Sequence, residues 1–231
     1  MNLADVDTVF LDAGGVLLQP RKTRVTAALA EVGVEIDCGR LTEAHYRGMA
    51  AIDRALSEPE VFGDYHEAYI DHLGLEAVDR LLALDVLRPL YAPGSLLWDE
   101  PLDGVVDGLR DLAGRGLTMV VVSNADGSVA DMLDSAGVLQ VGPGPGVEIA
   151  AIVDSGIIGI TKPDPRIFRH ALDLVGAEPD RTIHVGDAYE FDVMGARAAG
   201  IRPVLVDPFD LHPHADCVRV NGIADLAYLW T

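Results

Sequence analysis

Short runs of apolar residues, each followed by a polar residue or a glycine, recur along the chain and predict buried strands of a parallel sheet. The first run covers residues 5–12, ends in the carboxylate of Asp12 and is followed by Gly14 and Gly15, which indicate a tight turn. Similar runs occupy residues 117–122, 149–153, 182–185 and 203–206.

Helical patterns separate these runs. Residues 102–113 place apolar side chains at helical spacing, and Ser128 with Asp131 forms a capping box that predicts a second helix. A third helix is predicted over residues 164–175, where an acid and a proline begin it and Gly176 ends it. Strands that alternate with helices predict an α/β fold, with a Rossmann-like parallel sheet covered by helices.

One long stretch breaks the alternation. Residues 21–98 show helical periodicity and no convincing strand. This stretch is too long for a simple crossover between neighbouring strands. We therefore expect a core domain made of residues 1–18 and 99–231, with an inserted helical domain at residues 19–98. Residues 141–146 (VGPGPG) predict a loop, and its prolines lack the N–H donors of a phosphate-binding glycine loop.

The composition narrows the possible functions. Hydrophobic residues make up 49% of the 231 residues, which is typical of a folded domain. No apolar run reaches the roughly 18 residues of a membrane helix, and the first residues do not resemble a signal peptide. Cys38 and Cys217 are far apart and form no metal-binding or redox motif, so we expect reduced thiols in a cytoplasmic protein.

The formal net charge is −20, which disfavours binding to nucleic acid or to anionic membranes. A phosphorylated substrate would also be repelled at long range. Any phosphate site therefore needs local positive charge, from a lysine or from a metal ion.

Polar residues gather where the predicted strands end. Asp12 follows the first strand, Ser123 and Asn124 the second, Lys162 comes soon after the third, and Asp187 follows the fourth. Ligands of doubly wound sheets bind outside the carboxyl ends of the strands, so these residues are expected to converge. Each alone is typical of a turn or of a solvated surface; their joint placement favours a site.

Four segments carry a family resemblance: FLDAGGVLL, VVVSNADG, TKPDPRIF and VGDAYEFD. In this order they resemble the four motifs of the haloacid dehalogenase superfamily, and the helical insertion resembles its C1-type cap. The segment VMGARAAG, which continues the fourth motif, resembles the phosphatase-like members.

The resemblance implies a hydrolase of a small phosphorylated metabolite. It gives Asp12 the role of the nucleophile that forms an aspartyl-phosphate. Ser123, the backbone near Asn124, and Lys162 would hold the phosphoryl oxygens.

The resemblance also implies a bound Mg²⁺. Its ligands would be Asp12, the backbone carbonyl of Gly14 and Asp187, with Asp192 supporting them directly or through water. The physical reason is that carboxylates facing a phosphate repel it unless a divalent cation neutralises them.

The first motif departs from the phosphatase pattern at Gly14, where these enzymes usually carry a second Asp that acts as general acid and base. Such help is worth about 10²–10⁴ in rate, so its loss predicts a slow or specialised enzyme. A cap histidine could replace it, with three candidates: His45, His66 and His72.

Other functions are also compatible with a glycine in place of the second Asp. The substrate could have an acidic leaving group, as acyl phosphates and sugar 1-phosphates do, or the chain could bind a ligand or partner without catalysis. A 2-haloacid dehalogenase also lacks the second Asp. The GD-x4-D pattern of Asp187 and Asp192 is typical of metal-binding members, and favours the phosphatase.

Some further residues have simpler structural interpretations. His184 is expected to pack within its strand and Glu190 to lie solvated near a helix start. Aromatic packing and surface ion pairs are expected for six residues of the insertion: Tyr46, Phe62, Tyr65, Tyr69, Arg47 and Arg54.

Overall fold

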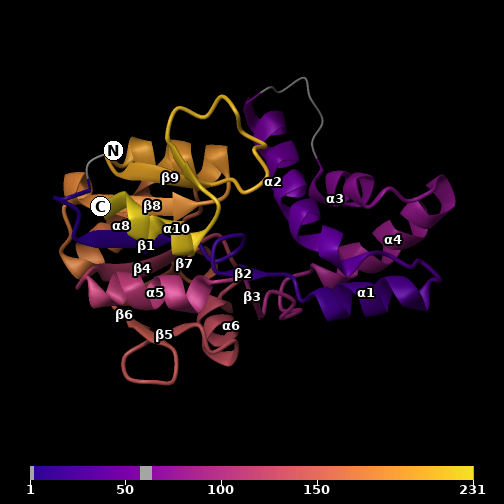
Figure 1. Cartoon of the computed structure of the whole chain (residues 1–231), viewed down its shortest axis with the longest axis horizontal. Coiled ribbons are helices and arrows are strands. Elements are labelled where there is room, and N and C mark those ends of the chain that lie inside the picture. Colours follow the sequence, from indigo (N-terminus) through magenta and orange to yellow (C-terminus); the bar gives the residue numbers. More distant parts are fainter. Residues whose placement is uncertain (1–2, 58–63, 231) are drawn as a thin grey trace.

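The computed structural model describes residues 3–57 and 64–230. Its centre is a six-stranded parallel sheet with the order β10-β9-β8-β1-β4-β7 (Figure 1). The strands are β1 (Thr8–Leu11), β4 (Thr118–Ser123), β7 (Ala151–Asp154), β8 (Thr182–Gly186), β9 (Arg202–Val206) and β10 (Val218–Val220). The predicted α/β fold with a parallel, helix-covered sheet is confirmed.

Helices cover both faces of this sheet. Strand β1 lies between β4 and β8, and all of its residues are buried. Val9 and Leu11 pack in the apolar cluster that contains Leu109 of α5 (Val105–Gly114). Phe10 packs in the cluster that contains Phe168 of α8 (Pro165–Val175). The central strand is uniformly apolar because both of its faces are covered.

The helices of the core follow the strands. They are α5 (Val105–Gly114), α6 (Val129–Ser135), α7 (Ser155–Ile158), α8 (Pro165–Val175), α9 (Gly195–Ala198) and α10 (Ile223–Leu226). Short 3-10 turns are η1 (Cys38–Arg40), η2 (Pro179–Arg181) and η4 (Ala227–Trp230), and η3 (Tyr189–Met194) is a π-helical turn. As predicted, Asp164 caps α8 through the Arg166 N–H, and Gly176 ends it with φ 67°.

The inserted stretch is helical. It contains α1 (Lys22–Glu31), α2 (Leu41–Ser57), α3 (Tyr65–Leu73) and α4 (Ala77–Leu90), which share an apolar cluster of their own. It leaves and re-enters the core through β2 (Leu18–Gln19) and β3 (Glu100–Pro101), which pair antiparallel. The helical insertion is thus confirmed, and the boundaries at residues 18 and 99 stay a prediction.

Three details differ from the sequence predictions. The run 149–153 is not one strand, because β6 (Val147–Ile149) pairs with β5 (Leu139–Val141) and β7 begins only after the exposed Ala150. Ala150 donates its N–H to Met119 O at 2.9 Å, and the chain changes sheets at this point. The short strands β2, β3, β5 and β10 were not predicted. Of the predicted loop 141–146, residues 142–146 form a loop, whereas Val141 ends β5.

The capping box at Ser128 is the third difference. Its hydroxyl donates to Asp126 and makes no capping bond. Instead, buried Asp154 accepts hydrogen bonds from Gly127 N at 3.0 Å and Val129 N at 3.3 Å. A carboxylate distant in sequence therefore caps α6, which a local pattern could not indicate.

No helix in residues 3–57 and 64–230 combines the length and the apolar character needed to cross a membrane. Both cysteines are free; Cys38 is exposed and Cys217 is partly buried.

Candidate active site

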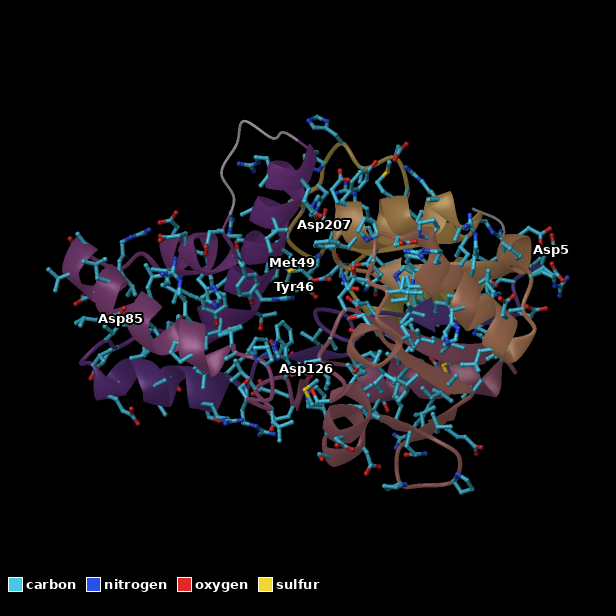
Figure 2. All side chains as sticks on the ribbon, turned by 180° about the vertical axis from the view of Figure 1, so that it is seen from behind. Asp5, Tyr46, Met49, Asp85, Asp126 and Asp207 are labelled. Atoms are coloured by element: carbon cyan, nitrogen blue, oxygen red, sulfur yellow. The ribbon has the colours of Figure 1, made fainter. Side chains whose placement is uncertain are left out.

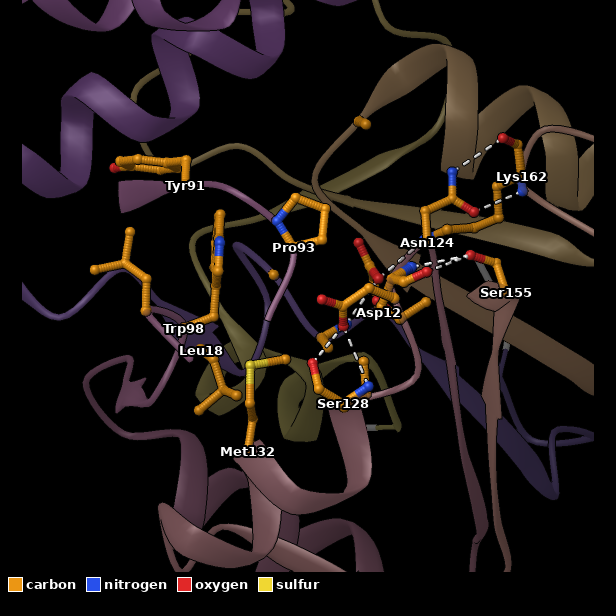
Figure 3. Close-up of a pocket in the computed structure, with 18 of the residues that line it drawn as sticks. Asp12, Leu18, Tyr91, Pro93, Trp98, Asn124, Ser128, Met132, Ser155 and Lys162 are labelled. Atoms are coloured by element: carbon orange, nitrogen blue, oxygen red, sulfur yellow. Dashed lines mark hydrogen bonds and ion pairs between the residues drawn. The ribbon is translucent and has the colours of Figure 1, made fainter. Parts of the chain in front are cut away.

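The carboxyl ends of the sheet strands meet the helical insertion around a cavity of about 500 Å³ (Figure 3). Asp12 follows β1, Ser123 ends β4 and Asp187 follows β8, while Lys162 comes from the segment after α7. All four side chains line the cavity. The predicted convergence of these residues is therefore present in the structure.

Lys162 holds two carboxylates together. Its Nζ lies 2.9 Å from Asp12 Oδ1 and 2.6 Å from Asp192 Oδ1, and its side chain is almost fully buried. Burial alone would lower the pKa of Lys162, but the charges of Asp12 and Asp192 outweigh it and raise that pKa. The ammonium is therefore firmly charged, as a phosphate-binding cation must be.

Asp192 has more polar contacts than Asp12 or Asp187. Besides Lys162, it accepts the Ala188 N–H at 3.1 Å and lies 2.8 Å from His184 Nε2. Burial raises the pKa of Asp192, but the nearby Lys162 charge and the His184 hydrogen bond lower it overall. His184 packs on the Phe168 ring as expected, but its contact with Asp192 was not predicted. A histidine buried in an apolar strand is itself a signal, because its ring nitrogens need partners.

Asp187 faces the helical insertion. Its Oδ2 lies 3.0 Å from Nε2 of buried His45 on α2, and His45 Nδ1 lies 2.9 Å from the Tyr65 hydroxyl. Burial is the main cause that raises the pKa of Asp187 to about 6, opposed by His45 and supported by the charges of Asp12 and Asp192. The site thus brings buried Asp187 close to two further carboxylates, those of Asp12 and Asp192.

Only one of the three candidate histidines lies at the described cavity wall. His45 lines it, whereas His66 lies 4.0 Å from Asp64 and His72 lies 3.6 Å from Glu43, both within the helical insertion. The structure therefore reduces the replacement-acid hypothesis to His45.

Asn124 and Ser123 occupy different positions at the end of β4. The Asn124 side chain donates to Lys162 O at 3.0 Å and accepts from Lys162 N at 2.7 Å. This pair of bonds fixes the backbone that carries the lysine. Buried Ser123 lines the cavity directly, where its hydroxyl can donate to a ligand.

The carboxylate set suits a divalent cation. One oxygen from each of Asp12, Asp187 and Asp192 can be chosen so that all lie within 4.8 Å of one another, and all three residues are buried. Three carboxylates face one lysine ammonium here, and hard cations such as Mg²⁺ prefer oxygen ligands. The residues present therefore fit a magnesium ion. Gly14 lines the same cavity, two residues after Asp12.

Two glycines allow the backbone to pass close to the carboxylates of Asp187 and Asp192. Gly15 has φ 67°, and an added Cβ would overlap the Asp187 carboxylate. An added Cβ at Gly186 would likewise overlap Asp192. Neither position has room for a side chain, which explains the glycines in the first and fourth motifs.

An aromatic ring borders the position of the missing side chain. A Cβ added at Gly14 would come within 3.2 Å of Trp98 Cζ3. The Trp98 ring is packed edge-to-face on His45, with centroids 5.1 Å apart and planes at 80°. The proton-transfer side chain is therefore absent, and its space is bordered by an indole from the insertion.

Helix α2 of the insertion forms hydrogen bonds with the core. The Tyr46 hydroxyl donates to Gly15 O at 2.6 Å, and buried Asp53 accepts the N–H groups of Tyr189 at 2.7 Å and Glu190 at 2.9 Å. Figure 2 shows Tyr46 where the insertion meets the core. Tyr46 and Asp53 thus act across the two parts, which sequence periodicity alone did not reveal.

The other residues of the insertion that were expected to form aromatic packing or surface ion pairs mostly do so. Tyr69 is buried in the helical cluster and Tyr65 packs against that cluster. Arg47 forms an ion pair with an acid one turn earlier on α2, and Arg54 is exposed. Phe62 lies outside the residues that the structure describes.

His212 completes the contact at Asp53. Its Nε2 lies 3.1 Å from Asp53 Oδ2, and Asp207 accepts the His212 N–H at 3.0 Å. Burial lowers the pKa of His212, but the hydrogen bond and charge of Asp53 and the charge of Asp207 raise it above its ordinary value of 6.5. A histidine whose pKa is higher in the folded state stabilises that state only while it is protonated.

The stabilisation by His212 should therefore be complete below pH 6.5 and be lost as the pH rises through the higher folded-state pKa. We expect His212→Gln to lower the free energy of unfolding by about 1–2 kcal/mol at pH 6, and by clearly less at pH 9. Urea unfolding at both pH values measures this. Exposed His214→Gln is the matched control, and an equal loss at both pH values would contradict the ion pair.

Comparison with known proteins agrees with this geometry. A family model described as haloacid dehalogenase-like hydrolase matches residues 6–200. The chain belongs to the haloacid dehalogenase-like hydrolases. The resemblance drawn from the four motifs is confirmed, and the inserted helices correspond to the helical cap of this family.

Two relatives illustrate the kinds of protein to which the sequence is similar. The chain is 38% identical over 114 residues to haloacid dehalogenase-like hydrolase domain-containing protein 3 of Bos taurus, covering 48% of this chain and 43% of that protein. It is 30% identical over 183 residues to a phosphoglycolate phosphatase of Rhodospirillum rubrum, covering 79% and 71%. Matches to the bovine, human and mouse forms of domain-containing protein 3 span half or less of those proteins.

Solved structures share the fold of this hydrolase. A 2-haloacid dehalogenase from Pseudomonas syringae superposes with a TM-score of 0.54 at 21% identity, covering 97% of each chain. At such low identity the likeness concerns the fold alone. The chemistry has to be argued from the side chains.

Proposed function

We propose that this chain is a Mg²⁺-dependent phosphomonoester hydrolase that acts on a small phosphorylated metabolite through an aspartyl-phosphate at Asp12. The observation that carries the proposal is the position of Asp12 beside the buried Lys162 ammonium, with Asp187 and Asp192 close by. A nucleophilic carboxylate, a fixed cation and an oxygen-ligand set suit phosphoryl transfer.

In this reaction a carboxylate oxygen of Asp12 forms a bond to phosphorus while the bond from phosphorus to the ester oxygen breaks. Water then attacks the aspartyl-phosphate, which releases inorganic phosphate and restores the carboxylate. Lys162, the Ser123 hydroxyl and the backbone at Asn124 would stabilise the phosphoryl oxygens. Asn124 also keeps the Lys162 backbone in place.

Asp12, Asp187 and the Gly14 carbonyl would hold Mg²⁺, and Asp192 would support them directly or through water. The ion would neutralise the repulsion between these carboxylates and the phosphate. The strong Lys162 and His184 contacts of Asp192 suit this supporting role.

The proton for the leaving group has no obvious donor. His45 is the one candidate histidine at the described cavity wall, but both of its ring nitrogens are engaged, by Asp187 and by Tyr65. This favours the hypothesis that the substrate has an acidic leaving group over the hypothesis that His45 replaces the missing Asp.

Dehalogenation of a 2-haloacid is the second candidate, favoured by Gly14. Against it stand Asp187 and Asp192, because two further buried carboxylates would repel a carboxylate substrate. A ligand-binding protein without turnover is the third.

We expect the wild-type chain to release phosphate from an aryl phosphate with Mg²⁺, and EDTA to reduce that rate at least about 100-fold because the carboxylates would then repel the substrate. Phosphate release measures this, and added Mg²⁺ should restore the rate. Metal-independent halide release from a 2-haloacid would favour the dehalogenase instead. No turnover of either substrate would favour the binding protein.

A further inference from the structure

We propose that the cavity accepts phosphate monoesters of uncharged phenols, and that Trp98 is the residue that selects them. This inference rests on the proposed phosphatase activity and names the substrate class of the same site. It depends on the charges that line the cavity, on its apolar wall and on the position of the Trp98 ring.

The charges of the wall disfavour an anionic leaving group. Among the described residues that line the cavity, Lys162 is the only Lys or Arg. It already contacts Asp12 and Asp192 and is buried at the phosphoryl end. Asp126 adds a carboxylate to the same wall, where its charge is stabilised by the Ser128 hydroxyl and the Gly94 N–H, which lower its pKa. A carboxylate on the leaving group would thus meet negative charge and no free cation.

The wall beyond the phosphoryl site is largely apolar. Its apolar members come from the cap, the core and the segment that joins them, and include Leu18, Met49, Pro93, Trp98, Met132 and Phe191. Figure 3 shows Pro93, Trp98 and Met132 facing the cavity across from Asp12 and Lys162. Methionine and indole side chains pack well against aromatic rings.

The Trp98 ring is held in one orientation. It packs edge-to-face against His45 at 5.1 Å and against Tyr91 at 6.3 Å between ring centroids. Since a Cβ on residue 14 would lie 3.2 Å from its Cζ3, the indole borders the position just beyond Asp12 where a leaving group departs. A flat ring bound to the phosphate oxygen can stack there.

The lack of a proton donor beside this ring is the reason to expect a preference for phenols over aliphatic alcohols. When the Asp12 oxygen bonds to phosphorus, the bond to the ester oxygen breaks and the leaving group departs with the electron pair. A phenolate bears this charge without prior protonation and takes its proton from water afterwards, whereas an alkoxide needs a donor during the step. At the position of that donor the site has Gly14, bordered by the apolar ring of Trp98.

The experiment compares three esters with Mg²⁺: phenyl phosphate, 4-carboxyphenyl phosphate and benzyl phosphate. We expect kcat/KM for phenyl phosphate to exceed that for the carboxylated ester at least about tenfold, through KM. We expect it to exceed that for benzyl phosphate at least about 100-fold, through kcat. The carboxylated ester tests the charges and the benzyl ester tests the missing donor.

Two variants test the residues. Trp98→Phe keeps a ring, and Trp98→Leu removes the stacking; the second should lower kcat/KM for phenyl phosphate about tenfold or more, with the first in between. Trp230→Phe is the matched control, since the chain has two tryptophans. Met132→Lys places a cation on the wall and should raise the relative kcat/KM of the carboxylated ester about tenfold.

The outcomes separate the two proposals. If wild-type protein hydrolyses none of the esters but releases phosphate from acetyl phosphate with Mg²⁺, the phosphatase stands and the substrate class is overturned. If it hydrolyses neither the esters nor acetyl phosphate, the phosphatase function itself is wrong. If it hydrolyses phosphate esters but prefers the carboxylated or the benzyl ester, the phosphatase stands and the substrate class is overturned. If Trp98→Leu matches Trp230→Phe on phenyl phosphate while both remain folded, Trp98 does not select the substrate.

Discussion

Replacement of Asp12 by asparagine should reduce phosphate release at least about 10³-fold, the largest effect on activity that we expect. The amide keeps the size of the side chain but cannot attack phosphorus to give a stable acyl phosphate. Single-turnover assays with phenyl phosphate and Mg²⁺ would measure the rate. Acid-quenched wild-type protein should also retain phosphate on the chain, and Asp12→Asn should not.

The control for this substitution is structural. Lys162 keeps its contact with Asp192 in the variant, so the thermal midpoint should shift by only a few degrees. Asp131→Asn, an exposed change on α6, serves as the matched neutral substitution and should retain full activity. Hydrolysis by Asp12→Asn at the wild-type rate would show that another group attacks phosphorus.

The sequence predicted the parts of the site that depend on strand ends. Asp12, Ser123 and Asp187 follow or end apolar runs, and parallel strands bring their carboxyl ends to one edge of the sheet. That rule needs no knowledge of side-chain packing. It therefore placed the central residues correctly, although it mistook residues 149–153 for a single strand.

The contacts between the cap and the core could not be predicted. His45 and Asp187 are 142 positions apart, and Asp53 and Tyr189 are 136 apart. Helical periodicity shows which face of α2 is apolar, but not which core loop that face meets. The surroundings of Gly14 likewise could not be predicted, because only the three-dimensional structure places Trp98 beside it.

Replacement of Lys162 by methionine should cause the largest loss of stability. The ammonium is buried and contacts Asp12 and Asp192, which would be left facing each other without its positive charge. Removing one partner of a buried ion pair costs about 3–5 kcal/mol, so we expect a loss of that size in the free energy of unfolding. Urea unfolding at pH 7 in EDTA would measure it, because added cations could substitute for the lysine.

The double variant Lys162→Met/Asp192→Asn distinguishes charge from packing. If the loss arises from uncompensated carboxylates, removing one of them should recover at least about 1 kcal/mol relative to Lys162→Met alone. His184 could still contact the new amide, since its Nε2 lies 2.8 Å from Asp192 Oδ1 in the native chain. A double variant less stable than Lys162→Met would mean that the contacts of the Asp192 carboxylate with Ala188 and His184 outweigh its repulsion by Asp12. In that case the electrostatic account of this cluster would be wrong.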